Sequence, residues 1–178
     1  MNNKTPLFFV LIFSILFLAN TSLAYTLKLL SWNTMLLPFP LSWSSQGART
    51  KEITKKLKNF DADIIFLQEV FIPSSGRKIM HSLKKKFPHQ FYLKRKEKSA
   101  TILSSGLLVL SKLPFKKLGH IYFENFLKFN TDRFASKGAI FIEIEHPDAP
   151  NKTLSFATTH LQSGFAEKHN NVRLKQLA

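Results

Sequence analysis

The 178-residue sequence contains no cysteine, so no disulfide bridge can stabilise the fold. A chain of this length without disulfides needs a hydrophobic core of its own, which excludes a small stapled scaffold. Internal repeats and low-complexity tracts are also missing, and this excludes a repeat architecture. We therefore expect a single domain with a real core.

Acidic residues are scarce: 11 Asp and Glu stand against 26 Lys and Arg, giving a formal net charge of +15. Such a surface attracts polyanions, for example nucleic acid, acidic lipid or phosphate-bearing substrates. The net charge indicates which partners the protein attracts, not which reaction it catalyses. An equally good interpretation is that the positive charge only keeps an exported protein soluble and serves no binding role.

The sequence has no apolar run long enough to cross a bilayer, which takes about 20 residues. Its longest run, residues 7–18, follows Lys4 and precedes small residues that end in Ala24. This is the layout of a secretory signal peptide, with a membrane anchor as the alternative. We expect residues 1–24 to be removed between Ala24 and Tyr25. The mature protein would then be secreted, extracellular or periplasmic, without a transmembrane segment.

The first half of the remaining sequence alternates predicted strands with predicted helices. Apolar residues at helical spacing and uninterrupted apolar runs indicate the two kinds of element. The predicted strands are residues 25–32, 64–68 and 105–110, and the predicted helices are 48–60 and a segment through Ile79, Leu83 and Phe87 that stops at Pro88.

The second half is typical of a β-hairpin. Residues 139–145 alternate, with Ile140, Ile142 and Ile144 on one side, and a longer loop at 147–151 joins them to a strand over 153–161. The end of the sequence is polar and then helical. This mixture predicts an α/β sandwich rather than a doubly wound parallel fold.

Three apolar runs end in polar side chains that can handle phosphate. Asn33 ends the first, Glu69 follows Leu67-Gln68, and His160 follows Thr158-Thr159. Three strand ends that carry an amide, a carboxylate and an imidazole favour a site for a hard metal and a phosphate.

Together these segments resemble the endonuclease/exonuclease/phosphatase superfamily, and within it the secreted bacterial sphingomyelinase branch. The matching stretches are Ser31-Trp32-Asn33, Met35-Leu36, Trp43, Gln46, Arg49, and residues 63–71, 106–111, 132–138 and 159–162. The resemblance implies a partial α/β/β/α four-layer sandwich, with residues 25–178 as the N-terminal portion of the domain.

The resemblance also implies a phosphodiesterase that uses Mg²⁺ or another divalent cation and cleaves sphingomyelin to ceramide and phosphocholine. Glu69 would be the metal ligand, Asn33 a partner to metal or phosphate, and His160 a hydrogen-bond donor to phosphate and general acid. Without the family context, an isolated glutamate at a strand end is usually plain surface.

Two further predictions concern an ion pair near the site and the loop after the first strand. Lys137 and Asp132 lie in a stretch that borders the family's cleft, where the lysine could pair with phosphate and the aspartate could orient a polar neighbour; a surface ion pair is the alternative. The loop from Met35 to Trp43 carries Phe39, Leu41 and Trp43 and could contact a lipid surface through them, but packing on the sandwich edge is favoured.

The family's second half supplies Gly-Asp-x-Asn and Ser-Asp-His segments, and this sequence has neither. We therefore expect the C-terminal half of the domain to be missing and activity to be low, because such groups act as a unit. Two alternatives remain open: a nuclease or phosphoinositide phosphatase with the same site, and a non-catalytic remnant that binds anionic surfaces.

Overall fold

The computed structural model describes residues 25–41, 45–127 and 131–178. These residues form a mixed sheet in the order β1-β2-β4-β3 and an antiparallel sheet in the order β5-β6-β7. The strands of the first sheet are β1 (Leu29–Leu36), β2 (Ile64–Val70), β3 (His89–Tyr92) and β4 (Leu108–Ser111). The strands of the second sheet are β5 (Lys116–Tyr122), β6 (Gly138–His146) and β7 (Ala149–Thr159).

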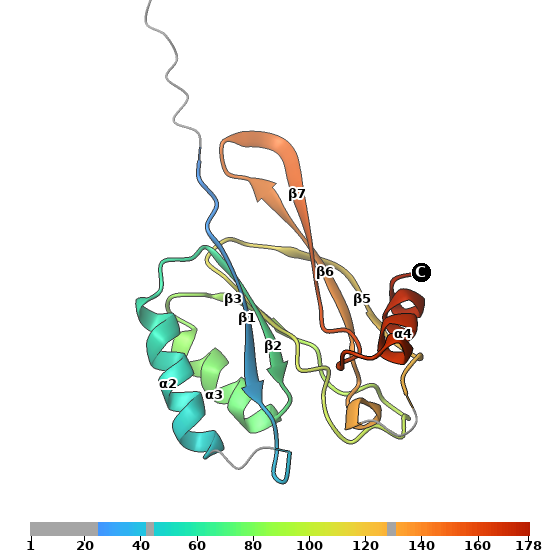
Figure 1. Ribbon diagram of the computed structural model, residues 1–178. Helices are drawn as coiled ribbons and strands as arrows, with labels where there is room; N and C mark the ends of the chain where they lie inside the picture. Colours follow the sequence, from blue (N-terminus) through green and yellow to red (C-terminus); the bar gives the residue numbers. More distant parts are fainter. Residues whose placement is uncertain (1–24, 42–44, 128–130) are drawn as a thin grey trace, which may run out of the picture.

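Helices α2 (Gln46–Asn59) and α3 (Pro73–Leu83) cover the outer face of the first sheet, and the second sheet packs on its other face (Figure 1). A short 3-10 helix, η1 (Thr131–Phe134), precedes β6, and α4 (Glu167–Leu177) lies on the far side of the second sheet. This layer order confirms the predicted α/β sandwich.

Strand β2 lies at the centre of the fold because both of its faces are apolar. Ile65 and Leu67 pack toward α2 and α3, whereas Ile64 and Phe66 pack toward the second sheet. The predicted alternation of β6 is also confirmed, since its three isoleucines enter the core between the sheets. Burying both faces of a strand fixes its register, because a slip of one residue would exchange the two faces.

Several predicted boundaries were wrong. Strand β1 begins at Leu29 rather than Tyr25, because the backbone N–H of Lys28 bonds to the Asp63 carboxylate instead of a strand. It also continues to Leu36, which pairs with Val70 and is fully buried, although this end was expected to be loop.

The hairpin loop is shorter than expected, because His146 pairs directly with Ala149. Pro150 was therefore expected in the loop but lies in β7, where it is tolerated because β7 is an edge strand. Helix α3 ends at Leu83, before Pro88. Strands β3 and β5 were not predicted, and β5 is exposed along most of its length, so it carries little apolar pattern.

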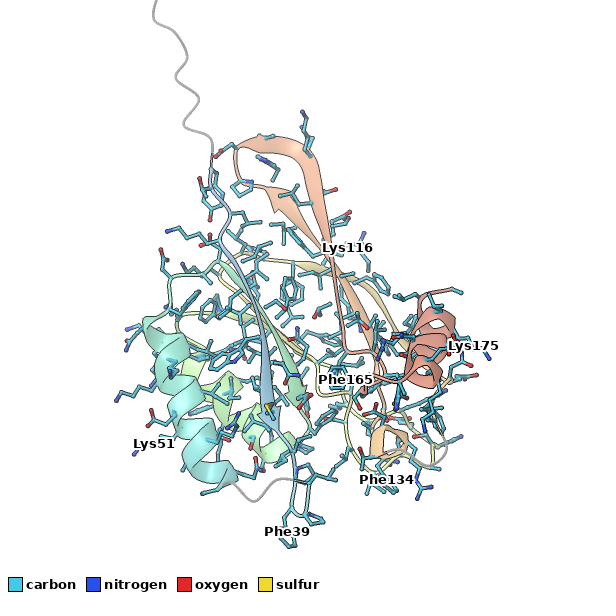
Figure 2. The ribbon with its side chains drawn as sticks, in the orientation of Figure 1. Phe39, Lys51, Lys116, Phe134, Phe165 and Lys175 are labelled. Carbon is cyan, nitrogen blue, oxygen red and sulfur yellow. The ribbon has the colours of Figure 1, made fainter. Side chains whose placement is uncertain are left out.

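Among the described residues, no helix has the length and apolar character needed to cross a bilayer. The predicted signal peptide, residues 1–24, and Trp43 lie outside the described residues. Phe39 is 71% exposed at the tip of the loop after β1, so the favoured packing of this side chain on the sandwich edge was wrong (Figure 2).

Candidate active site

The parallel pair β1 and β2 brings the first two candidate residues together at its carboxyl end. Asn33 pairs with Gln68 in the strand register, and the Asn33 amide donates from Nδ2 to Oε1 of Glu69 over 2.8 Å. The Asn33 Oδ1 accepts the backbone N–H of Met35 at 3.0 Å. The amide therefore has one end fixed by the turn and the other against the carboxylate.

Glu69 departs from the strand alternation through its backbone. Its φ of 57° lies in the left-handed region, so Val70 rather than Glu69 continues the apolar row under the helices. The Glu69 side chain instead contacts the end of the second sheet. Because non-glycine residues adopt this conformation reluctantly, it marks a local strain of the kind that gathers at functional sites.

His160 follows β7 and meets Glu69 from the other sheet. Its Nε2 lies 3.4 Å from Oε1 of Glu69, and both side chains are mostly buried. The ring also lies beside Phe71, with centroids 6.0 Å apart. The carboxyl ends of β2 and β7 thus bring amide, carboxylate and imidazole into one site.

Lys137 and Asp132 form a buried ion pair next to this group. The Lys137 Nζ lies 2.9 Å from Oδ1 of Asp132 and donates to the carbonyl of Leu161 at 2.7 Å. The Asp132 Oδ2 accepts from the Gln162 amide and from the backbone and hydroxyl of Ser163. The alternative of a surface ion pair was therefore wrong, since Lys137 is only 4% exposed.

The electrostatics of the pair follow from burial and mutual charge. Burial lowers the pKa of Lys137, while the neighbouring Asp132 and Glu69 act against this change. Burial alone would raise the pKa of Asp132, but Lys137 and the Ser163 donors outweigh it and lower that pKa. Each partner of the pair thus favours the charged form of the other, and Glu69 adds to this effect on Lys137.

Burial and the positive charge of Lys137 lower the pKa of His160 to about 4, although Asp132 acts in the opposite sense. The imidazole is neutral at pH 7 in this state. Its Nδ1 is buried with no hydrogen-bond partner among the described residues. A neutral ring that faces a carboxylate carries its proton on Nε2, because an unprotonated Nε2 would repel the Glu69 oxygen.

An open cleft of about 570 Å³ lies where the two sheets end, and it is lined by Ser31, Asn33, Phe66, Gln68, Ala157, Thr158, Thr159, His160, Leu161, Gln162 and Ser163. Gln68 joins the two sheets here, since its Nε2 donates to Ser31 Oγ at 3.1 Å and to Thr158 Oγ1 at 3.3 Å. Gln68 and Gln162 were not predicted as site residues. Their positions next to Glu69 and His160 in the sequence were the available signal.

The donors fit a strongly hydrated ion better than a closed metal cage. The described residues contain no cluster of three or more His, Asp or Glu side chains arranged for a metal. Glu69 offers one carboxylate, and Mg²⁺ characteristically keeps several waters beside one or two carboxylates. Asn33 turns its Nδ2 toward Glu69, so it could offer oxygen to the same ion only after its amide rotates.

The chain was compared with protein families and with curated proteins. Residues 30–147 match the model of the Endonuclease/Exonuclease/phosphatase family. This match includes Asn33, Glu69, Asp132 and Lys137 and ends before His160. None of the curated proteins matches the chain.

Solved structures share the fold. Beta toxin from Staphylococcus aureus, in a mutant with bound magnesium ions, is 24% identical with a TM-score of 0.71, over 86% of this chain and 57% of its own. Sphingomyelinase C from Streptomyces griseocarneus is 21% identical with a TM-score of 0.67, over 86% and 57%. The 2',3'-cyclic phosphatase ANGEL2 is 21% identical with a TM-score of 0.55, over 85% and 45%. The chain therefore spans less than two thirds of the length of each of these proteins.

Proposed function

Because the chain belongs to the endonuclease/exonuclease/phosphatase family, we propose that its site serves a metal-dependent phosphodiesterase of the sphingomyelinase type. The products would be ceramide and phosphocholine. The observation that carries the proposal is the meeting of Asn33, Glu69 and His160 at the joined ends of the two sheets. Fold similarity to beta toxin and sphingomyelinase C supports this choice of substrate.

Glu69 would hold the divalent ion, with Asn33 beside it, and the ion would neutralise charge that develops on the phosphoryl oxygens. Lys137 contributes a fixed positive charge, although its Nζ is already engaged by Asp132 and Leu161. This lysine therefore orders the loop that carries His160 and makes the site more favourable for an anion, rather than gripping phosphate directly.

His160 would donate the Nε2 proton toward the leaving oxygen of the substrate. With a pKa of about 4 the ring is neutral before substrate binds, so it has to take up a second proton from solvent before it can act as a general acid. A phosphodiester anion next to the ring favours the charged imidazolium and raises that pKa toward neutrality. Proton donation by His160 is therefore coupled to occupation of the cleft.

A second candidate is hydrolysis of nucleic acid or of a phosphoinositide at the same site. The net charge of +15 favours association with either polyanion, and one structural neighbour is a 2',3'-cyclic phosphatase. We further propose that residues 1–24 act as a secretion signal, so that the substrate is met outside the cytoplasm.

The test measures phosphocholine release from sphingomyelin liposomes beside nicking of plasmid DNA, each with Mg²⁺ and with EDTA, using the product of the complete gene. We expect Mg²⁺-dependent phosphocholine release that falls about 100-fold or more in Glu69→Gln. Glu145→Gln, an exposed change at the opposite end of β6, is the matched control and should keep activity.

Nicking without phosphocholine release would replace the sphingomyelinase proposal by the nuclease candidate. A protein without either activity would be the non-catalytic remnant. Equal activity in Glu69→Gln and wild type would remove Glu69 from the metal site.

A further inference from the structure

A second hollow lies on the outer face of the helix layer, separated from the cleft by the first sheet. It has a volume of about 470 Å³ and runs between α2 and α3. Its lining comes from Gly47, Thr50, Lys51, Thr54, Lys55, Lys58, Lys78 and Ser82, and we call it the lysine groove. Figure 2 shows Lys51 pointing away from the sheet on the outer side of α2.

The walls of the lysine groove carry four ammonium groups. Lys51, Lys55 and Lys58 repeat at the spacing of one helical stripe on α2, and Lys78 faces them from α3. All four side chains are exposed, and none of their ammonium groups forms an ion pair or hydrogen bond with another described residue. Among the described residues, no acidic side chain lines the groove. Like charges at such spacing repel one another, and an anion between them removes this repulsion.

The floor of the lysine groove consists of small side chains. Thr50 and Thr54 point their hydroxyl protons at backbone carbonyls of their own helix, at 2.7 Å each. Gly47, at the start of α2, leaves open space where a Cβ would lie. From Gly47 to Lys58 the helix rises roughly 16 Å, at about 1.5 Å per residue. The groove therefore suits an elongated anion better than a single compact one.

Two other polyanions fit this surface poorly. Of the residues that the structure describes, no aromatic side chain lines the lysine groove, so these residues offer the bases of a nucleic acid nothing to stack on. None of the large exposed apolar side chains of the described residues lies on α2 or α3. A helix face without such groups lacks the part that enters a membrane interface.

We propose that the lysine groove binds a short soluble oligophosphate, a row of phosphate groups held by Lys51, Lys55, Lys58 and Lys78. Ammonium groups on flexible stems can each contact a separate phosphate along such a row. The groove lies on the opposite side of the first sheet from Glu69, so this binding is independent of the proposed phosphodiesterase activity.

The experiment is calorimetric titration of the purified protein with sodium tripolyphosphate at low ionic strength. Replacing the four groove lysines by glutamine should weaken binding about tenfold or more, because several charge-assisted contacts are lost together. The matched control is the quadruple variant Lys116→Gln, Lys152→Gln, Lys168→Gln and Lys175→Gln, which removes the same charge from exposed positions elsewhere. We expect its affinity to stay within about twofold of wild type. Circular dichroism verifies that both variants are folded.

An equal loss in both quadruple variants would overturn the proposal, because net charge alone would then explain binding. Loss of tripolyphosphate binding in Glu69→Gln would also overturn it, since the ligand would then occupy the cleft. A parallel titration uses a 12-nucleotide single strand and phosphatidylserine vesicles. Tighter, groove-dependent binding of either one than of tripolyphosphate would replace the proposed ligand.

Discussion

At the scale of single residues, the site depends on buried charged groups whose protein partners are brought together only by folding. The Asp132 carboxylate is held by Lys137, by the Gln162 amide and by both polar groups of Ser163. A charge buried in this way is tolerated because its partners replace the lost water. The same pair orders the loop that carries His160, so stability and site geometry are linked here.

Lys137→Met should destabilise the protein by about 3 kcal/mol, because it leaves the Asp132 carboxylate without its buried cation. The double variant Asp132→Asn with Lys137→Met should recover part of this loss, since no unpaired charge remains. Urea unfolding of the wild type, the single variants Lys137→Met and Asp132→Asn, and the double variant at pH 7 measures both effects. A double variant as unstable as the sum of the two single variants would contradict the coupling.

Asp63 shows how an acidic residue gives pH-dependent stability. Its Oδ2 accepts the Lys28 backbone N–H at 2.9 Å, and its Oδ1 meets Lys112 at 3.1 Å. Burial alone would raise the pKa of Asp63, but these donors outweigh it and lower that pKa below the ordinary 3.8. The ionised form is therefore favoured by folding.

Asp63→Asn should cost about 2 kcal/mol of unfolding free energy at neutral pH, the size of hydrogen bonds to a charged group. Since the folded pKa is depressed, this contribution is fully present above the unfolded pKa and is lost as pH falls through the folded value. Urea unfolding at pH 7 and at pH 3 should show the difference from wild type shrinking in acid. The control is Glu124→Gln, which removes the exposed ion pair with Lys96. Its unfolding free energy should differ from wild type by less than about 0.5 kcal/mol at either pH.

At the scale of secondary-structure elements, the carboxyl end of α2 is capped by a distant lysine that the sequence pattern does not predict. The ammonium of Lys86, after α3, donates to the carbonyls of Lys58 at 2.7 Å and Phe60 at 2.6 Å. These are backbone acceptors at the carboxyl end of α2, where a cation is also favoured by the helix dipole. Lys86 thus joins the carboxyl end of α2 to the segment that follows α3.

Lys86→Met keeps the aliphatic stem but removes these donors, and we expect a loss of about 1–2 kcal/mol in unfolding free energy. Lys85→Met is the matched control at the preceding, exposed position, with an expected change within about 0.5 kcal/mol. Thermal and urea unfolding measure both. Equal effects of the two substitutions would show that Lys86 does not stabilise α2.

At the scale of the whole molecule, both sheets share one core. Ile142 of β6 packs in the same cluster as Phe66 and Val109 of the first sheet. Because neither sheet can bury its inner face alone, we expect the sheets to unfold in a single transition.

Ile142→Ala should lower the unfolding free energy by about 2–4 kcal/mol through the cavity that it leaves. The tryptophans precede β2 in the sequence, and Trp32 packs on the core under the helices. Their fluorescence should therefore shift its unfolding midpoint together with the circular dichroism signal. A fluorescence midpoint that stays at the wild-type value would mean that the two sheets unfold separately.

The sequence by itself determined the layers and the chemical groups. Periodicity in β6 and apolar runs such as Ile64–Leu67 dictate which faces are buried, and these patterns are local. The polar residues that end three of these runs, Asn33, Glu69 and His160, could be identified in the same way, because a polar side chain directly after a buried run contrasts with its apolar neighbours.

Only the tertiary structure decided how these groups meet. The left-handed backbone at Glu69, the burial of Lys137 against Asp132 and the neutral state of His160 arise from contacts between residues far apart in the chain. The same holds for the lysine groove, whose walls come from two helices. Sequence patterns record what each segment prefers to bury, whereas distances, pKa changes and grooves depend on which segments pack together.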